Sequence, residues 1–133
     1  MAFPKDFLIG AATAAHQVEG NNIHSDYWLQ EQMPHTSFTE PSGLACDHYN
    51  RYEEDIRLLA DAGLNAYRFS VEWARIEPEE GRFDEAEVEH YRRVIACCIM
   101  SMKRLEMAAS CRPMLASLIV QMVFSSPPSR SVT

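Results

Sequence analysis

The segment 65–71 reads Asn65-Ala66-Tyr67-Arg68-Phe69-Ser70-Val71. A short run rich in aromatic and β-branched residues is typical of a β-strand. Because successive side chains of a strand point to opposite faces, Tyr67, Phe69 and Val71 are expected to share one face. Arg68 then lies on the other face. Its guanidinium keeps its charge, so it is either buried against a partner acid or solvated on an edge strand.

A helix is predicted on each side of this strand. Residues 47–62 place their apolar side chains on one helical face, with Asp47 as the N-cap and Gly63 as the residue that ends the helix. Residues 84–98 show the same amphipathic pattern. There, Asp84 and the glutamate three positions later predict a capping box.

A second strand is expected near the N-terminus. The run Phe7-Leu8-Ile9-Gly10-Ala11-Ala12 is short and apolar, and a glycine interrupts it. The expected order is therefore strand, long loop, helix, strand, loop, helix. Strands that alternate with helices indicate βα units and a parallel sheet, so the predicted fold class is α/β.

Length, charge and cysteine content narrow the possible functions. The chain has 133 residues, enough for one domain, and a formal net charge of −7. An acidic chain argues against binding to nucleic-acid phosphates or anionic lipid, so neither nucleic acid nor a membrane is expected as a partner. The four cysteines and five histidines show no metal-ligand spacing, and no cofactor-binding glycine motif occurs. We expect no metal, no cofactor, and reduced thiols in the cytoplasm, since no secretory signal pattern is visible.

The composition changes after Cys98. Residues 1–98 hold 18 acidic and 8 basic side chains, whereas residues 99–133 hold one acidic and four basic ones together with five of the seven methionines. The Ser/Pro/Arg-rich residues 125–131 are not expected to pack. Two parts are therefore predicted. Residues 1–98 form a structured unit, and residues 99–133 form a tail of foreign composition that is frameshifted, or disordered at its end.

Side chains that follow the two strands are the candidates for chemistry, because functional residues of parallel α/β folds gather at the carboxyl ends of strands. Gln17 lies a few residues past the first strand. Its amide can hydrogen-bond two adjacent hydroxyls of a sugar, although a loop glutamine facing water fits the pattern as well. Glu72 directly follows the second strand. The other acids lie in runs typical of solvated helix faces or turns.

Two stretches resemble motifs of glycoside hydrolase family 1, the family of β-glucosidases and 6-phospho-β-glucosidases. The first runs from Phe7 to Gly20 and ends in His16-Gln17-Val18-Glu19-Gly20. The second comprises residues 47–56 and the segment Tyr67-Arg68-Phe69-Ser70-Val71-Glu72-Trp73-Ala74-Arg75-Ile76-Glu77-Pro78. The resemblance covers residues 3 to about 98.

This resemblance implies the first two βα units of a (β/α)₈ TIM barrel. The barrel is incomplete here, since a whole one needs about 250 residues. It also implies a retaining mechanism, in which one glutamate acts as acid/base and a second, about 5 Å away, acts as nucleophile. By the same resemblance, Gln17 binds hydroxyls of the terminal sugar of a β-glucoside or phospho-β-glucoside. Arg68 supports the nucleophilic glutamate.

The motifs that carry both glutamates in that family, Asn-Glu-Pro and Thr-Glu-Asn-Gly, do not occur in this chain. Thr39-Glu40-Pro41 is superficially similar but precedes the first long helix, so it is expected to be an ordinary loop. We therefore expect that this chain contains neither catalytic glutamate. It would then be a piece of a retaining β-glycosidase that is inactive alone. The alternative is a non-catalytic fragment that acts at most as a weak sugar- or partner-binding module. In either case, self-association through open sheet edges is expected.

Overall fold

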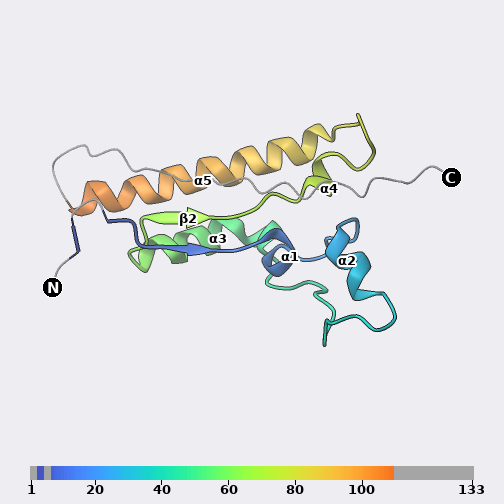
Figure 1. The fold of residues 1–133 in the computed structure, drawn as a ribbon. Helices are drawn as coiled ribbons and strands as arrows, with labels where there is room; N and C mark the ends of the chain where they lie inside the picture. The colour runs from blue at the N-terminus through green and yellow to red at the C-terminus, as the bar shows by residue number, and fades with distance from the viewer. Residues whose placement is uncertain (1–2, 5–6, 110–133) are drawn as a thin grey trace.

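Two short parallel strands and two long helices form the framework of the molecule. The structure is a computed structural model that describes residues 3–4 and 7–109. Its elements are β1 (Gly10–Ala12), α1 (Ala15–Val18), α2 (Asp26–Glu31), α3 (His48–Asp61), β2 (Ala66–Arg68), α4 (Trp73–Ile76) and α5 (Glu85–Ala109), as Figure 1 shows. β1 pairs with β2 in parallel, with Gly10 opposite Ala66 and Ala12 opposite Arg68. The predicted α/β arrangement is therefore confirmed.

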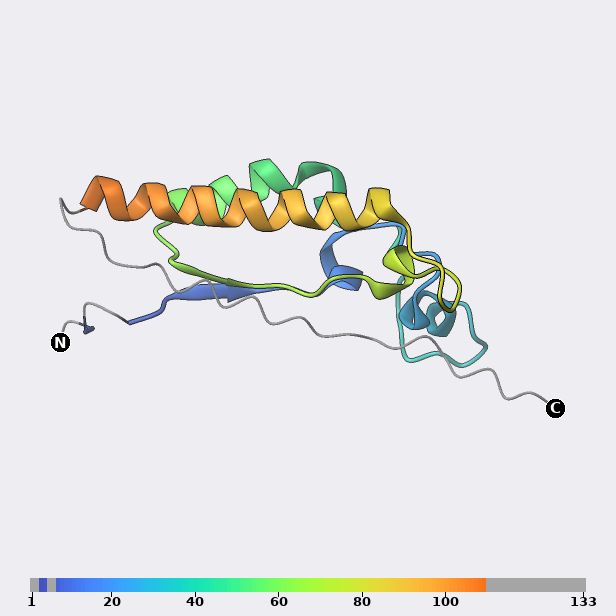
Figure 2. The ribbon, with the colours of Figure 1, turned by 90° about the horizontal axis from the view of Figure 1, so that it is seen from above.

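The long helices α3 and α5 lie on one side of the sheet, so the described part has two layers (Figure 2). The hydrophobic core fills the space between them and consists of Ile56, Tyr67, Phe69, Val71, Ile76, Tyr91, Val94 and Cys98. Tyr67, Phe69 and Val71 are buried in this core, whereas Arg68 is exposed. The alternation predicted for residues 65–71 is thus confirmed, and it leaves the second face of the sheet without a helix in the described part of the chain.

Both strands are shorter than the apolar runs that predicted them. At the start of β1, the Ile9 N–H donates to Asn65 Oδ1 at 2.7 Å, and Asn65 Nδ2 donates to the Phe7 carbonyl at 3.1 Å. These side-chain bonds supplement the backbone here, where the Ile9 carbonyl accepts from the Asn65 N–H at 2.9 Å. At the other end, the Ala15 N–H donates to Ser70 Oγ at 2.7 Å, so the chain leaves the sheet there through another side-chain contact.

The start of α3 differs from the prediction. Asp47 occupies the N-cap position, but its φ is 55° and its side chain makes no capping bond. The carboxylate bonds a side chain of the first turn in place of a backbone N–H, because Oδ1 accepts a hydrogen bond from Asn50 Nδ2 at 2.7 Å. The position of the helix start was predictable, whereas the capping mechanism was wrong.

The predicted capping box of α5 is half formed. Asp84 Oδ1 accepts hydrogen bonds from the Ala86 and Glu87 N–H groups at 2.9 and 3.3 Å. The Glu87 carboxylate does not return to the cap. It accepts from the Tyr49 hydroxyl at 2.9 Å, which links α5 to α3. A tertiary contact has therefore taken the side chain that the local motif assigned to the helix end.

Three short helices occupy segments expected to be loops. α2 is capped by Ser25, whose Oγ accepts from the Trp28 N–H at 3.1 Å, and α1 and α4 each have four residues. α5 runs through Cys98 to Ala109. Most of the predicted tail, residues 110–133, lies outside the described residues, and the division of the chain at residue 98 stays a prediction. Within the described residues, no helix has the length and hydropathy needed to cross a bilayer.

Candidate functional site

A cleft of about 220 Å³ opens at the carboxyl ends of the two strands. Two segments supply most of its wall, one following β1 and one at the end of β2, and α2 adds a ring. The lining residues are Thr13, Ala14, Ala15, His16, Tyr27, Arg68, Phe69, Ser70, Val71 and Glu72. This is the end of the sheet where functional side chains of parallel α/β folds gather.

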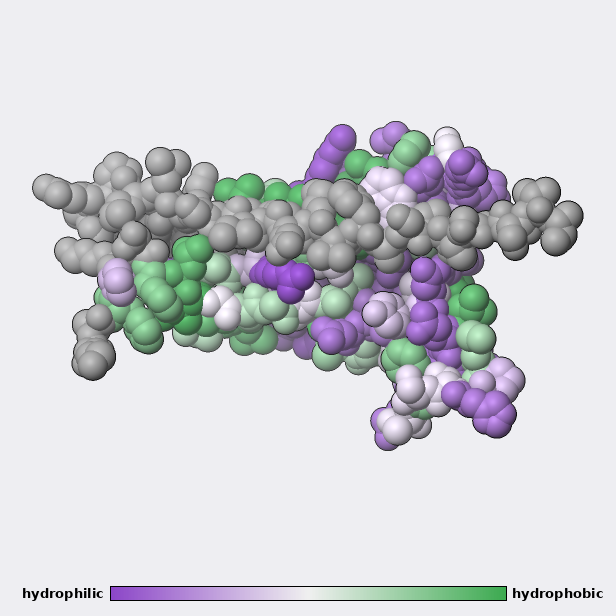
Figure 3. All heavy atoms as spheres, viewed as in Figure 1, coloured by the Kyte–Doolittle hydropathy of each residue, from purple (hydrophilic) through white to green (hydrophobic). Residues whose placement is uncertain are grey.

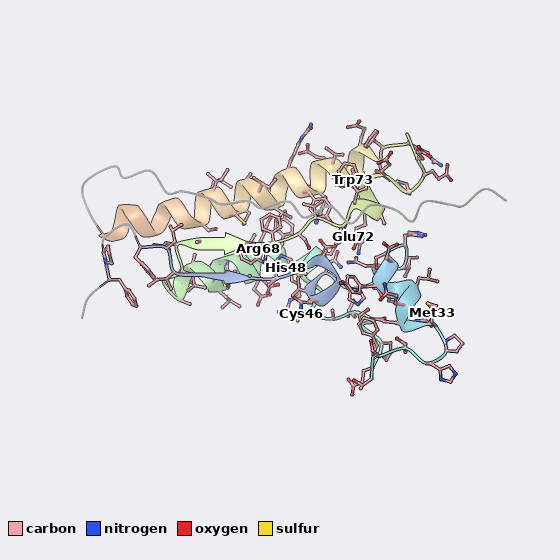
Figure 4. All side chains as sticks on the ribbon, viewed as in Figure 1. Met33, Cys46, His48, Arg68, Glu72 and Trp73 are labelled. Atoms are coloured by element: carbon pink, nitrogen blue, oxygen red, sulfur yellow. The ribbon has the colours of Figure 1, made fainter. Side chains whose placement is uncertain are left out.

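Arg68 contributes the guanidinium of the cleft. It ends β2 on the face away from the core, and Figure 4 labels it on the same run of chain as Glu72. Its backbone carbonyl accepts from the Thr13 N–H at 3.0 Å, which joins the two strand ends. The side chain is exposed and forms no ion pair within the described part of the chain. Of the two environments that the sequence allowed, the solvated one is observed.

Gln17 lies in α1 next to the cleft and is not among its lining residues. The side chain is exposed, and Oε1 accepts from the Ala14 N–H at 3.2 Å, which closes the first turn of α1. The amide oxygen thus has a local structural use. The role of Gln17 in binding sugar hydroxyls stays a prediction.

His16 anchors α1 to the loop that follows it. Its Nε2 lies 2.8 Å from Glu31 Oε1, and its ring stacks on Tyr27 with a centroid distance of 5.2 Å. Glu31 also accepts from the Ser42 N–H and hydroxyl at 3.1 Å. Burial alone would raise the pKa of Glu31, but the Ser42 hydrogen bonds and His16 together lower it below its ordinary value. These contacts hold the wall that carries Tyr27.

Glu72 is the one acid that lines the cleft among the described residues. It is buried, and burial raises the pKa of its carboxyl. Oε1 accepts from the Ala74 N–H at 3.4 Å and so caps α4, and Oε2 accepts from Asn22 Nδ2 at 3.5 Å. The structure therefore gives Glu72 a structural role, and no second carboxylate of the described residues faces it across the cleft.

A buried polar network behind the cleft was missed by the sequence analysis. The Tyr91 hydroxyl donates to Glu19 Oε1 at 2.8 Å and accepts from the Glu72 N–H at 3.1 Å. Arg75 Nε lies 3.4 Å from Glu19 Oε2, and Arg75 Nη2 donates to the Gly20 carbonyl at 2.7 Å. Burial is the main cause that raises the pKa of Glu19 to about 7.

One signal could have pointed to this network. A tyrosine on the apolar face of a helix buries a hydroxyl that needs a hydrogen-bond partner, and Tyr91 holds that place on α5. No local pattern identifies the partner, because Glu19 lies 72 positions earlier in the chain.

The parallel pairing, the helices on the outer face and the cleft at the strand ends define the class of the protein. It is an α/β protein with βα units like those of (β/α)₈ barrels, whose active sites lie at the carboxyl ends of the strands.

Comparisons with known proteins specify the family. The model of glycosyl hydrolase family 1 matches residues 1–104, so the chain belongs to this family. β-Glucosidase A of Acetivibrio thermocellus is 41% identical over 101 residues, which cover 71% of this chain and 22% of that protein. The aryl-phospho-β-D-glucosidase BglC of Bacillus subtilis is also 41% identical over 101 residues, covering 71% of this chain and 21% of its own length.

Solved structures agree with this assignment. The β-glycosidase BGL167 superposes with a TM-score of 0.71 at 61% identity, over 75% of this chain and 24% of that one. The β-glucosidase of Thermotoga maritima in complex with castanospermine superposes with a TM-score of 0.69 at 36% identity, over 75% and 24%. The described fold is therefore part of a (β/α)₈ barrel, and the match spans about a quarter of these structures.

Proposed function

We propose that the chain carries the first part of the sugar-binding site of a retaining β-glucosidase. The observation that supports this most strongly is the family match over residues 1–104, together with a cleft at the strand ends that the same residues line. The β-glucosidase A of Acetivibrio thermocellus and the aryl-phospho-β-D-glucosidase of Bacillus subtilis are equally identical to this chain. The proposed substrate class is therefore a β-glucoside, with or without a phosphate on the sugar.

Two side chains have proposed roles at this site. Gln17, beside the cleft, would bind hydroxyls of the terminal sugar through its amide. Arg68, exposed in the cleft, would hold the nucleophilic glutamate of a whole family enzyme ionised and in position, because a guanidinium favours a neighbouring carboxylate.

We further propose that the chain alone does not hydrolyse glycosides. Retaining hydrolysis needs two carboxyl groups about 5 Å apart. Among the described residues, Glu72 is the one acid that lines the cleft, and its carboxylate is engaged in capping α4.

The described cysteines, Cys46, Cys97 and Cys98, are free, which supports a reducing compartment such as the cytoplasm.

Turnover and binding separate these proposals. The purified chain is expected to release no nitrophenol from nitrophenyl β-glucoside or its 6-phosphate above the uncatalysed rate, with the Thermotoga maritima β-glucosidase as positive control. In an NMR titration with methyl β-glucoside, Gln17→Ala is expected to weaken binding about tenfold, since a hydrogen-bonding side chain contributes about 1 kcal/mol or slightly more. Gln30→Ala is the matched control, because Gln30 is an exposed helical glutamine on α2.

Measurable turnover by the purified chain would show that it carries its own pair of acids. Equal affinities of the wild type and both variants for methyl β-glucoside would exclude Gln17 from the sugar site. This result does not depend on whether the chain hydrolyses glycosides.

A second candidate function is binding to a partner, in particular a second copy, through the sheet. The observation that favours it is the uncovered face and edges of the β1–β2 sheet in the described part (Figure 2). Hydrophobic side chains gather at the end where β1 begins (Figure 3), where Phe7, Leu8 and Ile9 are exposed. A sheet with such an edge is a template for pairing with another chain.

Sedimentation velocity tests this association. The wild type is expected to show a sedimentation coefficient that rises with concentration, and Ile9→Lys is expected to remove most of that rise by placing a charge at the exposed edge. Leu58→Lys, at an exposed site on α3, is the control and should leave the rise in place. A concentration-independent monomer with one sharp unfolding transition would contradict the association.

A further inference from the structure

We infer that Tyr91 is a positioning residue of the proposed sugar site. Tyr91 is on α5 and does not line the cleft, but its hydroxyl joins the end of α1 to the segment that follows β2. It thereby sets where Gln17 lies relative to that segment. The inference rests on the proposed function, because it concerns how the same site is held in shape.

The Tyr91 hydroxyl is bonded to both chain segments beside the cleft. It donates to Glu19 Oε1 at 2.8 Å and accepts from the Glu72 N–H at 3.1 Å. Glu19 is the C-cap residue of α1, and Glu72 lines the cleft after β2. All three residues are 5% exposed. One buried hydroxyl therefore links the two segments.

α1 depends on such contacts for its position. It has four residues, whereas isolated helices shorter than about 12–15 residues are only marginally stable in water. Its start is bound to the segment after β2, because the Ala15 N–H donates to Ser70 Oγ at 2.7 Å. Its end is bound at Glu19. Gln17 lies between these two anchors, so the place of its amide depends on both of them.

The ring of Tyr91 gives the hydroxyl a fixed position. The ring is part of the hydrophobic core, and a phenylalanine would keep this packing. Without the hydroxyl, however, Glu19 Oε1 and the Glu72 N–H each lose a partner in a buried place. Buried polar groups without a partner are unfavourable, so both segments are expected to shift until these atoms find other partners.

A second link lets the fold survive the loss of this hydroxyl. Arg75 Nε lies 3.4 Å from Glu19 Oε2, and Arg75 Nη2 donates to the Gly20 carbonyl at 2.7 Å and to Asn22 Oδ1 at 2.6 Å. These contacts hold the chain that follows α1 to α4. We therefore expect Tyr91→Phe to fold and to change the position of α1.

An NMR titration of the full chain with methyl β-glucoside tests the inference. Tyr91→Phe is expected to weaken binding about three- to tenfold, because the loss of one buried hydrogen bond displaces the helix that carries Gln17. In the wild type, the Tyr91 hydroxyl proton is expected to exchange slowly with water and to give a cross-relaxation peak with the Glu72 N–H.

Val94→Ala is the matched control. Val94 is a core residue of the same helix, 3% exposed, and the substitution removes apolar contacts without touching the polar network. It is expected to lower the midpoint of urea unfolding and to leave the affinity for methyl β-glucoside unchanged. A loss of stability alone is thereby separated from a displaced sugar site.

Four results would overturn the inference: wild-type affinity in Tyr91→Phe, an equal loss of affinity in Val94→Ala, a Tyr91→Phe chain that does not fold, or a wild type without the hydroxyl peak. A wild type that does not bind methyl β-glucoside would overturn the proposed function and this inference with it. The failure of the proposed function is thus distinguishable from a failure of the inference alone.

Discussion

Gly20→Ala is expected to prevent the chain from reaching its native structure, with a loss of stability above about 3 kcal/mol. Gly20 has a φ of 85°, a conformation that residues with a Cβ rarely adopt. In addition, a Cβ at this position would overlap the backbone of Leu44, at its carbonyl carbon and oxygen. Backbone cannot rotate away as a side chain can. Moving it would also displace the Gly20 carbonyl that accepts from Arg75.

Gly63→Ala separates the two causes. Gly63 has a nearly equal φ of 83°, but a Cβ there meets no atom within 4 Å. It should therefore cost only the conformational strain, about 1 kcal/mol. Urea unfolding followed by circular dichroism measures both variants against the wild type. Equal losses for the two variants would show that the Leu44 contact is unimportant.

Relative to Glu19→Gln, the wild type is expected to lose about 3 kcal/mol of unfolding free energy as the pH rises from about 4 to about 8. Burial raises the pKa of Glu19 from 4.5 to about 7. Between these two values the folded chain holds a proton that the unfolded chain has released. The resulting stability is complete below about pH 4.5 and is lost as the pH rises through about 7. A neutral glutamine has no such dependence.

Other titratable groups near Glu19 also affect how the unfolding free energy of each variant depends on pH. Those that interact with it are Tyr91 on α5, Arg75 on α4, Glu72 at the start of α4 and Tyr49 on α3. His90 on α5 and His48 on α3 line a cavity of about 10 Å³ together with Glu19. Burial lowers the pKa of His90 to about 4, so His90 contributes stability that is lost as the pH falls from about 6.5 to about 4. The pKa of Glu72 is also raised by burial, so the unfolding free energy of Glu19→Gln still falls to some extent as the pH rises.

The measurement is a series of urea titrations across this pH range at one fixed protein concentration, with the Glu19 carboxyl followed by NMR in parallel. Glu80→Gln controls for the change of net charge, because Glu80 is an exposed carboxylate in a turn. Parallel pH profiles for the wild type and Glu19→Gln would contradict the prediction, as would a Glu19 carboxyl that titrates near 4.5.

The sequence was informative wherever a local pattern coincides with burial. Alternation in residues 65–71 predicted which side chains enter the core, and a helical period predicted α3 and α5. Both patterns act within one element, where neighbours in the chain are also neighbours in space. The alternation of strands and helices predicted the parallel sheet, and the family motifs added that the sheet is part of a (β/α)₈ barrel.

The hydrogen-bond partners of individual polar side chains could not be predicted in this way. Asp47 was expected to cap α3, but its positive φ turns the carboxylate towards Asn50. Glu87 was expected at a helix cap, but the Tyr49 hydroxyl of another helix binds it. At the candidate site, the amide oxygen of Gln17 is used within its own turn of helix. In each case a hydrogen-bonding side chain had several possible partners, and the local pattern does not show which of them it bonds in the folded chain.

The parallel pairing of β1 with β2 has a consequence for biosynthesis. Gly10 and its partner Ala66 are separated by 56 positions along the chain. A ribosome adds roughly 5–20 residues per second, so the first strand waits roughly 3–11 s for its partner to be made. During that interval the apolar residues 7–9 have no sheet to join, and they offer a nascent-chain segment of the kind that chaperones bind.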